Sequence, residues 1–197
     1  MTPQILILAA GASARMRGAD KLLESVGGAP LIARITQAAL ATGALVTLAL
    51  PPDRPARLAA LGALPVARIT VPDPSMGMAA SLHAGLRAIP RADPVLLLLA
   101  DLPEITAADL QLMLAEWRRT SDLILRGTAQ DGTPGHPVCF PPWARADLMQ
   151  LSGDEGARSV IARHRDRLRL VALADRHATT DLDTPEEWQE WRRRTPD

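Results

Sequence analysis

Short apolar runs alternate with amphipathic segments along most of the chain. The apolar runs contain few polar residues, which is typical of strands that are buried on both faces of a sheet. We expect strands in the first half at 4–9, 45–50, 67–71 and 94–100. We expect helices between them at 30–42, 54–63 and 78–89. This alternation predicts an α/β fold with a mostly parallel central sheet and helices on both faces.

The second half of the chain is less regular. Thr106 is expected to cap a helix that ends near Arg119, with Asp109 at its third position. Thr184 is expected to cap a last helix that begins with Pro185. The other elements that we expect are strands at 122–127, 136–140 and 168–173, a helix at 156–165 and the last helix at 184–194. No repeat or linker divides the sequence, so we expect a single domain over 1–197.

Composition limits the kind of protein. Hydrophobic residues make up 47% of the chain, and 22 basic residues balance 22 acidic ones, which disfavours a nucleic-acid-binding surface. The one cysteine, Cys139, excludes an intramolecular disulfide and fits a reducing compartment, and we expect it to be a small buried strand residue. The longest apolar run is too short and interrupted to span a membrane. These features predict a soluble cytoplasmic protein that binds neither nucleic acid nor membrane.

The stretch "LAAGASARMRGADKLL" at 8–23 follows the first expected strand with small residues and then with basic ones. Small residues let backbone N–H groups approach a ligand, while Arg15 and Lys21 would neutralise an anion. Open α/β sheets bind ligands at such strand ends. The stretch matches neither the Walker A pattern nor the dinucleotide fingerprint. A solvated loop with ordinary surface cations would explain it equally well.

Acidic residues stand at two further positions of interest. Asp101 follows the expected strand 94–100, where a carboxylate suits Mg²⁺, although a turn aspartate before a proline is the alternative. Asp181 and Asp183 alternate, so in an extended segment they point the same way. A negative charge at Asp183 also favours the dipole of the helix that follows, and this role alone would explain it.

Two glycine-containing segments complete the candidate chemistry. "GTPGHPVCF" at 132–140 places His136 at the mouth of a strand, and the alternative is a surface histidine in a loop. The four histidines lack the spacing of zinc ligands. "DPSMGMAASLHAGL" at 73–86 is a turn that leads into a helix and could form one wall of a ligand pocket.

Together and in this order, these segments resemble the molybdopterin nucleotidyltransferases, and among them the molybdenum cofactor cytidylyltransferases. The matching segments cover nearly the whole chain and read "LAAGASARMRGADKLL", "GMAASLHAGL", "LADLP", "GHPVCF", "GDEGAR" and "DLDTPEE". The last four together are more specific than the opening loop. The resemblance implies a Rossmann-like nucleotidyltransferase fold. It also implies transfer of CMP from CTP to the terminal phosphate of molybdopterin, with release of pyrophosphate.

The resemblance also implies roles for residues. Asp101 and Asp183 would bind Mg²⁺, or Mn²⁺ in its place. Arg15, Lys21 and Asp101 would be catalytic, and His136 would contact the acceptor, best when its imidazole is protonated. The nucleotide-binding residues would be Ala9, Ala10, Gly11, Ala12, Ser13, Arg15, Lys21, Ser75, Gly77, Ser81 and Asp101. A recipient molybdoenzyme or its chaperone would be the protein partner.

Some positions depart from the family pattern, and other activities stay open. Arg17 stands where relatives usually have glycine, and Ala100 and Leu102 flank Asp101 in place of frequent glycine and glutamine. A guanylyltransferase for the same cofactor resembles "LAGG" where this chain has "LAAG"; the methyl group of Ala10 would crowd a purine, which favours CTP. The further alternatives are a cytidylyltransferase for a sugar or alditol phosphate and a non-catalytic cofactor-binding chaperone of a molybdoenzyme.

Overall fold

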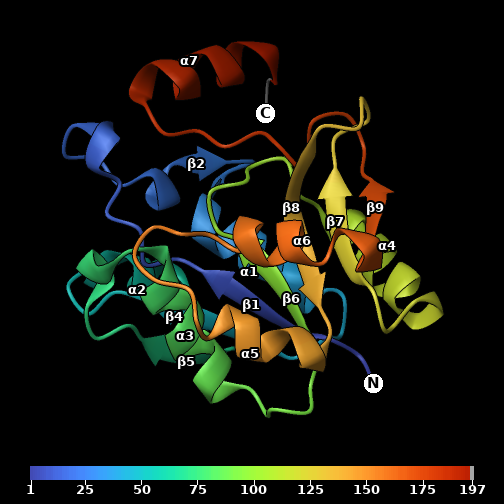
Figure 1. The fold of residues 1–197 in the computed structure, drawn as a ribbon. Coiled ribbons are helices and arrows are strands. Elements are labelled where there is room, and N and C mark those ends of the chain that lie inside the picture. The colour runs from blue at the N-terminus through green and yellow to red at the C-terminus, as the bar shows by residue number, and fades with distance from the viewer. Residues whose placement is uncertain (196–197) are drawn as a thin grey trace.

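The computed structural model describes residues 1–195, and its centre is a seven-stranded sheet with the order β5-β4-β1-β6-β8-β7-β9 (Figure 1). Its strands are β1 (Gln4–Leu8), β4 (Val46–Leu50), β5 (Ala67–Thr70), β6 (Val95–Leu99), β7 (Ile124–Thr128), β8 (Pro134–Phe140) and β9 (Leu168–Ala172). β8 runs antiparallel to both of its neighbours, and the other pairs in the sheet are parallel. The prediction of a mostly parallel α/β sheet is therefore confirmed.

Helices cover both faces of this sheet, as the sequence predicts. The helices are α1 (Leu31–Leu40), α2 (Pro55–Ala60), α3 (Met78–Ala88), α4 (Ala107–Arg119), α5 (Arg145–Leu148), α6 (Arg158–Arg163) and α7 (Pro185–Arg194). Because side chains alternate along a strand, Ile5 and Ile7 of β1 pack with α1 and α4 on one face. Leu6 and Leu8 pack with α3 and α6 on the other face.

The structure differs from the sequence-based elements where tertiary pairing decides. β5 is an edge strand that pairs only with β4, so most of its residues are exposed and not buried as expected. The strand expected from His136 begins two residues earlier, at Pro134. The sequence pattern did not predict α5 or the hairpin of β2 (Ser25–Val26) and β3 (Ala29–Pro30), because elements this short show no periodicity.

Helix ends and the one cysteine behave as expected from the sequence. Thr106 and Thr184 form capping boxes with Asp109 and Glu187 at the starts of α4 and α7. Cys139 is a fully buried residue of β8, and burial raises the pKa of its thiol well above the usual value. Among residues 1–195, no helix has the length and apolar character that crossing a bilayer requires.

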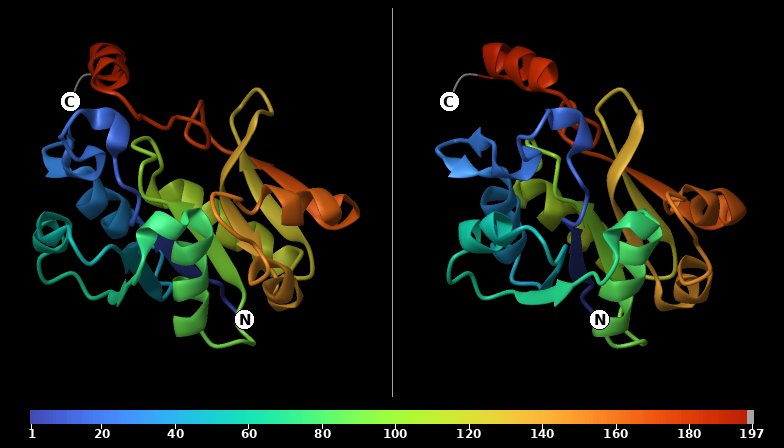
Figure 2. Two further views of the ribbon diagram at one scale, coloured as in Figure 1. Left: turned by 60° about the vertical axis from the view of Figure 1, so that its left-hand side comes forward. Right: turned by 90° about the vertical axis from the view of Figure 1, so that its left-hand side faces the viewer.

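The strand order places a crevice at the carboxyl end of β1. β1 lies between β4 and β6. After β1 the chain forms β4 and β5 on one side of β1, and it then crosses to form β6 on the other side. Ligands in open α/β sheets bind at such switch points. The views in Figure 2 show α7 at this end of the sheet, beside the segment that follows β1. Trp188 and Trp191 anchor α7 in the core on the α1 and α4 face.

Gly135 in β8 is a position where the fold has no room for a side chain. A Cβ atom there would lie 1.8 Å from the carbonyl oxygen of Ala178. We expect Gly135→Ala to lower the free energy of unfolding by about 1–3 kcal/mol, the usual cost of overpacking, in urea titrations. Gly156→Ala is the control, because a Cβ there would meet only the sulfur of Met78 at 3.6 Å. Equal stability of the two variants would contradict this packing argument.

Candidate active site

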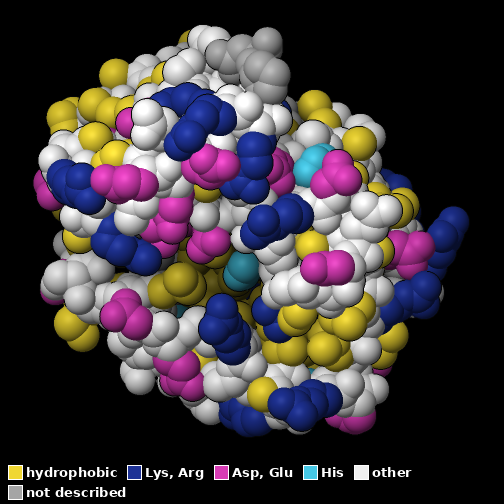
Figure 3. Space-filling model, turned by 90° about the horizontal axis from the view of Figure 1, so that it is seen from above, with side chains coloured by type: hydrophobic (Ala, Val, Ile, Leu, Met, Phe, Trp, Pro, Cys, Tyr) yellow, Lys and Arg dark blue, Asp and Glu magenta, His cyan; other side chains and the backbone are white. Residues whose placement is uncertain are grey.

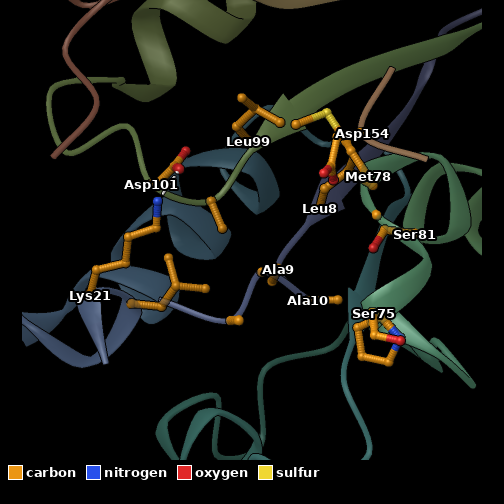
Figure 4. A pocket seen from close by; sticks show the side chains of 16 residues that line it. Leu8, Ala9, Ala10, Lys21, Ser75, Met78, Ser81, Leu99, Asp101 and Asp154 are labelled. Carbon is orange, nitrogen blue, oxygen red and sulfur yellow. Dashed lines mark hydrogen bonds and ion pairs between the residues drawn. The ribbon is translucent and has the colours of Figure 1, made fainter. Parts of the chain in front are cut away.

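A cavity of about 370 Å³ lies at the carboxyl ends of β1 and β6. Lys21 and Asp101 face each other at one end of it, and Ser75 and Ser81 lie on the opposite wall (Figure 4). A second cavity of about 390 Å³ shares Ala10, Gly11, Ala12, Pro74 and Ser75 with the first. The two cavities form one extended cleft. The molecule is hollowed on this face, with charged side chains around the hollow and with hydrophobic side chains and a histidine within it (Figure 3).

Most of the predicted nucleotide-binding residues line the first cavity. They are Ala9, Ala10, Gly11, Ala12, Lys21, Ser75, Gly77, Ser81 and Asp101. Ser13 and Arg15 do not line it, since Ser13 turns to Asp20 and the exposed Arg15 reaches Asp183 at 2.6 Å. The sequence analysis did not single out Asp154, Met78 or Leu99 as cavity residues. Asp154 belongs to the "GDEGAR" segment, which was the available signal for it.

The start of the loop offers backbone donors to the cavity. Within residues 1–195, the amides of Ala10, Gly11 and Ala12 donate to no carbonyl or side chain, although all three residues line both cavities. Backbone N–H groups that face a cavity at the end of a strand are suited to anions. These amides are available to a ligand in the cleft, and their role as a phosphate cradle stays a prediction.

Arg17 takes up a glycine conformation without being glycine. Its φ of 51° and ψ of 42° lie in the left-handed region, directly after the short 3₁₀ turn Ala14–Met16. Its guanidinium pairs with Glu186 of α7 at 2.8 Å. The loop therefore makes at Arg17 a bend that usually requires glycine, and the arginine side chain links the loop to the last helix.

Lys21 is the meeting point of three separate segments. Its ammonium nitrogen lies 2.6 Å from Oδ2 of Asp101 and 2.7 Å from Oδ1 of Asp183. Burial acts to lower the pKa of Lys21, but the charges and hydrogen bonds of the two carboxylates outweigh it and leave the pKa above its usual value. Lys21 therefore stays charged. The structure thus brings together the two predicted metal ligands and a predicted phosphate ligand.

The carboxylates at this point could hold a divalent cation. Oδ1 of Asp101 is buried and has no hydrogen-bond partner within residues 1–195, so it is available to a cation. Asp181 lies close enough that burial, together with repulsion from Asp101 and Asp183, raises its pKa. No group of three or more acidic, histidine or cysteine side chains is arranged for a metal in the described residues. Two carboxylates suit Mg²⁺, because Mg²⁺ completes its octahedron with water and substrate phosphates.

The "GMAAS" and "GDEGAR" segments meet at the cavity wall. Gly77 has a φ of 85°, and a Cβ atom there would lie 2.4 Å from the backbone of Gly153. The amide of Ala79 donates to the carbonyl of Gly153 at 3.0 Å. This close approach explains why glycine is required at position 77. It also places Asp154 and Ser81 in the same cavity.

His136 lies at the same edge of the sheet as Asp101, because β8 runs antiparallel to β6. Burial, with a further contribution from the charge of Arg126, lowers the pKa of His136 to about 4. Its Nδ1 atom is buried without a partner among the described residues. His136 is therefore neutral near pH 7 and not in the protonated form in which it would donate best, while its contact with the acceptor stays a prediction. It does not line either cavity beside the loop.

Comparisons with known proteins identify the family of the chain. The chain matches the model of the "MobA-like NTP transferase domain" over residues 5–168. A "Probable molybdenum cofactor guanylyltransferase" of Synechococcus elongatus is 33% identical over 201 residues, covering 93% of this chain and 95% of that protein. A Synechococcus sp. protein of the same name matches with the same identity and coverage.

Solved structures share the fold. The crystal structure of Rv0371c from Mycobacterium tuberculosis H37Rv superposes with a TM-score of 0.83 at 27% identity, covering 96% of this chain and 98% of that one. A structure of Rv0371c in complex with manganese has a TM-score of 0.78 at 24% identity, covering 96% and 97%. Together with the family match, these likenesses confirm the predicted nucleotidyltransferase fold.

The depressed pKa of His136 makes stability depend on pH. In the unfolded chain a histidine binds its proton near pH 6.5, whereas in the folded chain it does so near pH 4. Stability is therefore complete above pH 6.5 and falls as the pH drops toward 4, by on the order of 3 kcal/mol. We expect His136→Asn to flatten this acid limb in urea titrations between pH 7 and 4.5. An acid limb identical to that of the wild type would contradict the assignment.

The left-handed backbone at Arg17 can be tested with two variants that both lose the Glu186 pair. Arg17→Gly removes the steric cost of the left-handed conformation, while Arg17→Ala keeps it. We expect the glycine variant to have a free energy of unfolding about 1 kcal/mol above that of the alanine variant, measured by urea titration. A more stable alanine variant would show that the loop relaxes out of this conformation.

Proposed function

This chain belongs to the family of MobA-like NTP transferase domains, and we propose that it transfers a nucleoside monophosphate to the terminal phosphate of molybdopterin. The observation that carries the proposal is the convergence of Asp101, Asp183 and Lys21 beside the loop amides at the carboxyl end of β1. Two carboxylates, a partly buried ammonium group and amides without a partner among residues 1–195 form a set suited to a triphosphate and a divalent cation. The acceptor comes from the names of the relatives and from the resemblance.

The reaction makes one bond and breaks one. A terminal phosphate oxygen of the acceptor attacks the α-phosphorus of the nucleotide, and the bond from that phosphorus to the β-phosphate oxygen breaks. Lys21 and the loop amides, which line the cleft, would stabilise the charge of the leaving pyrophosphate. Asp101 and Asp183 would hold Mg²⁺, or Mn²⁺ as in the mycobacterial complex. The cation would neutralise phosphate oxygens as they approach one another.

Arg15 and Lys21 are already paired with carboxylates in this structure. Asp183 binds Arg15 through Oδ2 and Lys21 through Oδ1. When a triphosphate and its cation bind, the cation would pair with Asp183 and the phosphates would pair with Arg15 and Lys21. The two basic side chains could therefore turn from Asp183 to the phosphates. Arg15 is exposed and does not line the cleft, so its side chain must move to reach a phosphate there. A long side chain can change its rotamers without a movement of the loop backbone. We propose that Arg15 joins the phosphate contacts in this way.

The acceptor would lie on the β8 side of Asp101, opposite the nucleotide loop. His136, Arg126 and Arg158 lie close together there, since both arginines act on the pKa of His136. Arg126 and Arg158 form no ion pair within residues 1–195, and burial together with the charge of Arg158 lowers the pKa of Arg126. Two arginines without an ion-pair partner in the described part of the chain, beside a carboxylate that would be taken up by a cation, favour a phosphate-bearing acceptor. We propose that His136 contacts the acceptor there as a neutral hydrogen-bonding group.

Two donor nucleotides have support of different kinds. GTP is favoured by the names of the Synechococcus relatives, which are guanylyltransferases. CTP is favoured by Ala10, which is 4% exposed and whose methyl group lines both cavities. A methyl group in a cavity wall reduces the room for a purine. We propose GTP as the first candidate and CTP as the second.

Release of pyrophosphate tests the proposed reaction. We expect release with GTP or CTP that depends on molybdopterin and on Mg²⁺ or Mn²⁺. Asp101→Asn keeps the side-chain volume but removes a cation ligand, so we expect turnover to fall by about a hundredfold or more with unchanged thermal stability. Asp166→Asn, an exposed position away from the cleft, is the control. Turnover of Asp101→Asn at the wild-type rate would contradict the site, and release that ignores molybdopterin would contradict the acceptor.

The role of Ala10 is tested by Ala10→Gly. If the methyl group restricts the base, its removal raises the ratio of kcat/KM for GTP to that for CTP by about 5- to 150-fold, which corresponds to roughly 1–3 kcal/mol. The measurement is competition between the two nucleotides with the same acceptor. A ratio that does not change would show that Ala10 does not select the base, whichever nucleotide the wild type prefers.

A further inference from the structure

We propose that Arg57 is a positioning residue for the anion-binding loop, which we define as residues 9–13. Arg57 donates hydrogen bonds to carbonyl groups on the side of this loop that faces away from the cleft. These bonds orient the loop amides toward the nucleotide phosphates. The inference rests on the proposed function and adds to it a residue that lines neither cavity.

The burial of Arg57 is exceptional in this chain. Among residues 1–195 it is the only lysine or arginine that is buried, and its side chain has no exposed surface. A buried guanidinium is costly unless its N–H groups are paired and its charge is balanced. Arg57 comes from α2, a helix of six residues, and its contacts lie 37 to 48 positions away in the sequence. The cost of burying this side chain suggests that the segment that it contacts depends on it.

Two contacts set the orientation of the loop peptides. Nη1 of Arg57 donates to the carbonyl of Ala9 at 2.7 Å, and Nη2 donates to the carbonyl of Gly11 at 2.8 Å. In a trans peptide the C=O and the following N–H point in opposite directions. The amides of Ala10 and Ala12 therefore point away from Arg57. Both residues line the cleft, and neither amide has a partner among the described residues.

Arg57 also reaches the far end of the same segment. Its Nε and Nη2 donate to the two carboxylate oxygens of Asp20 at 2.7 and 2.9 Å. Asp20 in turn accepts from the amide of Leu22 and caps the short helix that starts with Lys21. Burial acts to raise the pKa of Asp20, but the hydrogen bonds and charge of Arg57 outweigh it and keep the pKa below its usual value. One side chain thus ties the loop amides to the phosphate-binding lysine.

The geometry requires an arginine. The planar guanidinium binds a carboxylate with two N–H groups while others reach two carbonyls and the hydroxyl of Ser13 at 3.2 Å. A lysine offers one charged point and could satisfy only part of this set. Because Asp20 balances its charge, Arg57 acts on a ligand through the backbone that it orients. It touches no reacting atom.

Binding of inorganic pyrophosphate and of the preferred nucleotide, without acceptor, tests the inference by calorimetry. We expect Arg57→Lys to weaken both by about tenfold or more, the effect of losing hydrogen bonds of the charged kind. Asp20→Asn keeps the shape of the side chain but removes the charge that pairs with Arg57. We therefore expect this variant also to bind pyrophosphate and nucleotide more weakly. Arg68→Lys is the matched control, because the exposed Arg68 also donates to loop carbonyls, those of Gly62 and Leu64.

Steady-state kinetics separates positioning from a general structural role. We expect the KM for the nucleotide to rise in Arg57→Lys, while the KM for the acceptor stays unchanged. The inference would be overturned if both variants, Arg57→Lys and Asp20→Asn, lost thermal stability but bound pyrophosphate as tightly as the wild type. An equal rise of both KM values would also overturn it. Wild-type protein that binds neither pyrophosphate nor nucleotide would contradict the proposed function itself, and the positioning role with it. If Arg57→Lys does not fold, the binding of Asp20→Asn decides.

Discussion

The contact of Lys21 with Asp101 and Asp183 is the interaction on which the rest of the site depends. It joins segments that are 80 and 162 positions apart in the sequence, and it places a partly buried ammonium between two carboxylates. The sheet order makes this contact geometrically accessible, because β1 and β6 are neighbours and their carboxyl ends open at one edge. Without a ligand the three charges partly balance one another. A triphosphate and a divalent cation would bring charges of both signs to the same place, so the site can exchange its internal partners for substrate.

The loop after β1 is organised in two layers. On the side of the cleft lie small residues and amides that have no partner among residues 1–195. On the opposite side, carbonyl groups of the loop accept hydrogen bonds from the buried guanidinium of Arg57. This division explains why the loop can consist of alanine, glycine and serine and still hold a defined shape. The side chain that stabilises the loop comes from α2. The binding surface therefore stays free of bulky groups.

The C-terminal segment is part of this site although the family match ends at residue 168. Asp183 contributes to the contact with Lys21, and α7 is anchored by Trp188 and Trp191 in the core. Arg17 adds an ion pair from the loop to Glu186. The arginine at position 17 thus links the loop to the last helix. The same helix carries a capping box at the residue after Asp183, and its Glu187 accepts a hydrogen bond from the backbone amide of Asp183, the position proposed to hold a cation.

The sequence by itself determined the elements with a clear period, the two capping boxes, and Asp101 at the end of a buried strand. These features depend on neighbours within a few residues, so the pattern contains them. It did not determine that β8 is antiparallel, that β5 is exposed, or that His136 is neutral. The sequence also did not reveal the burial of Arg57 or the place of Asp154 in the cavity wall. Only the tertiary structure decided these points, because strand pairing, desolvation and contacts between residues tens of positions apart arise from packing of the whole chain.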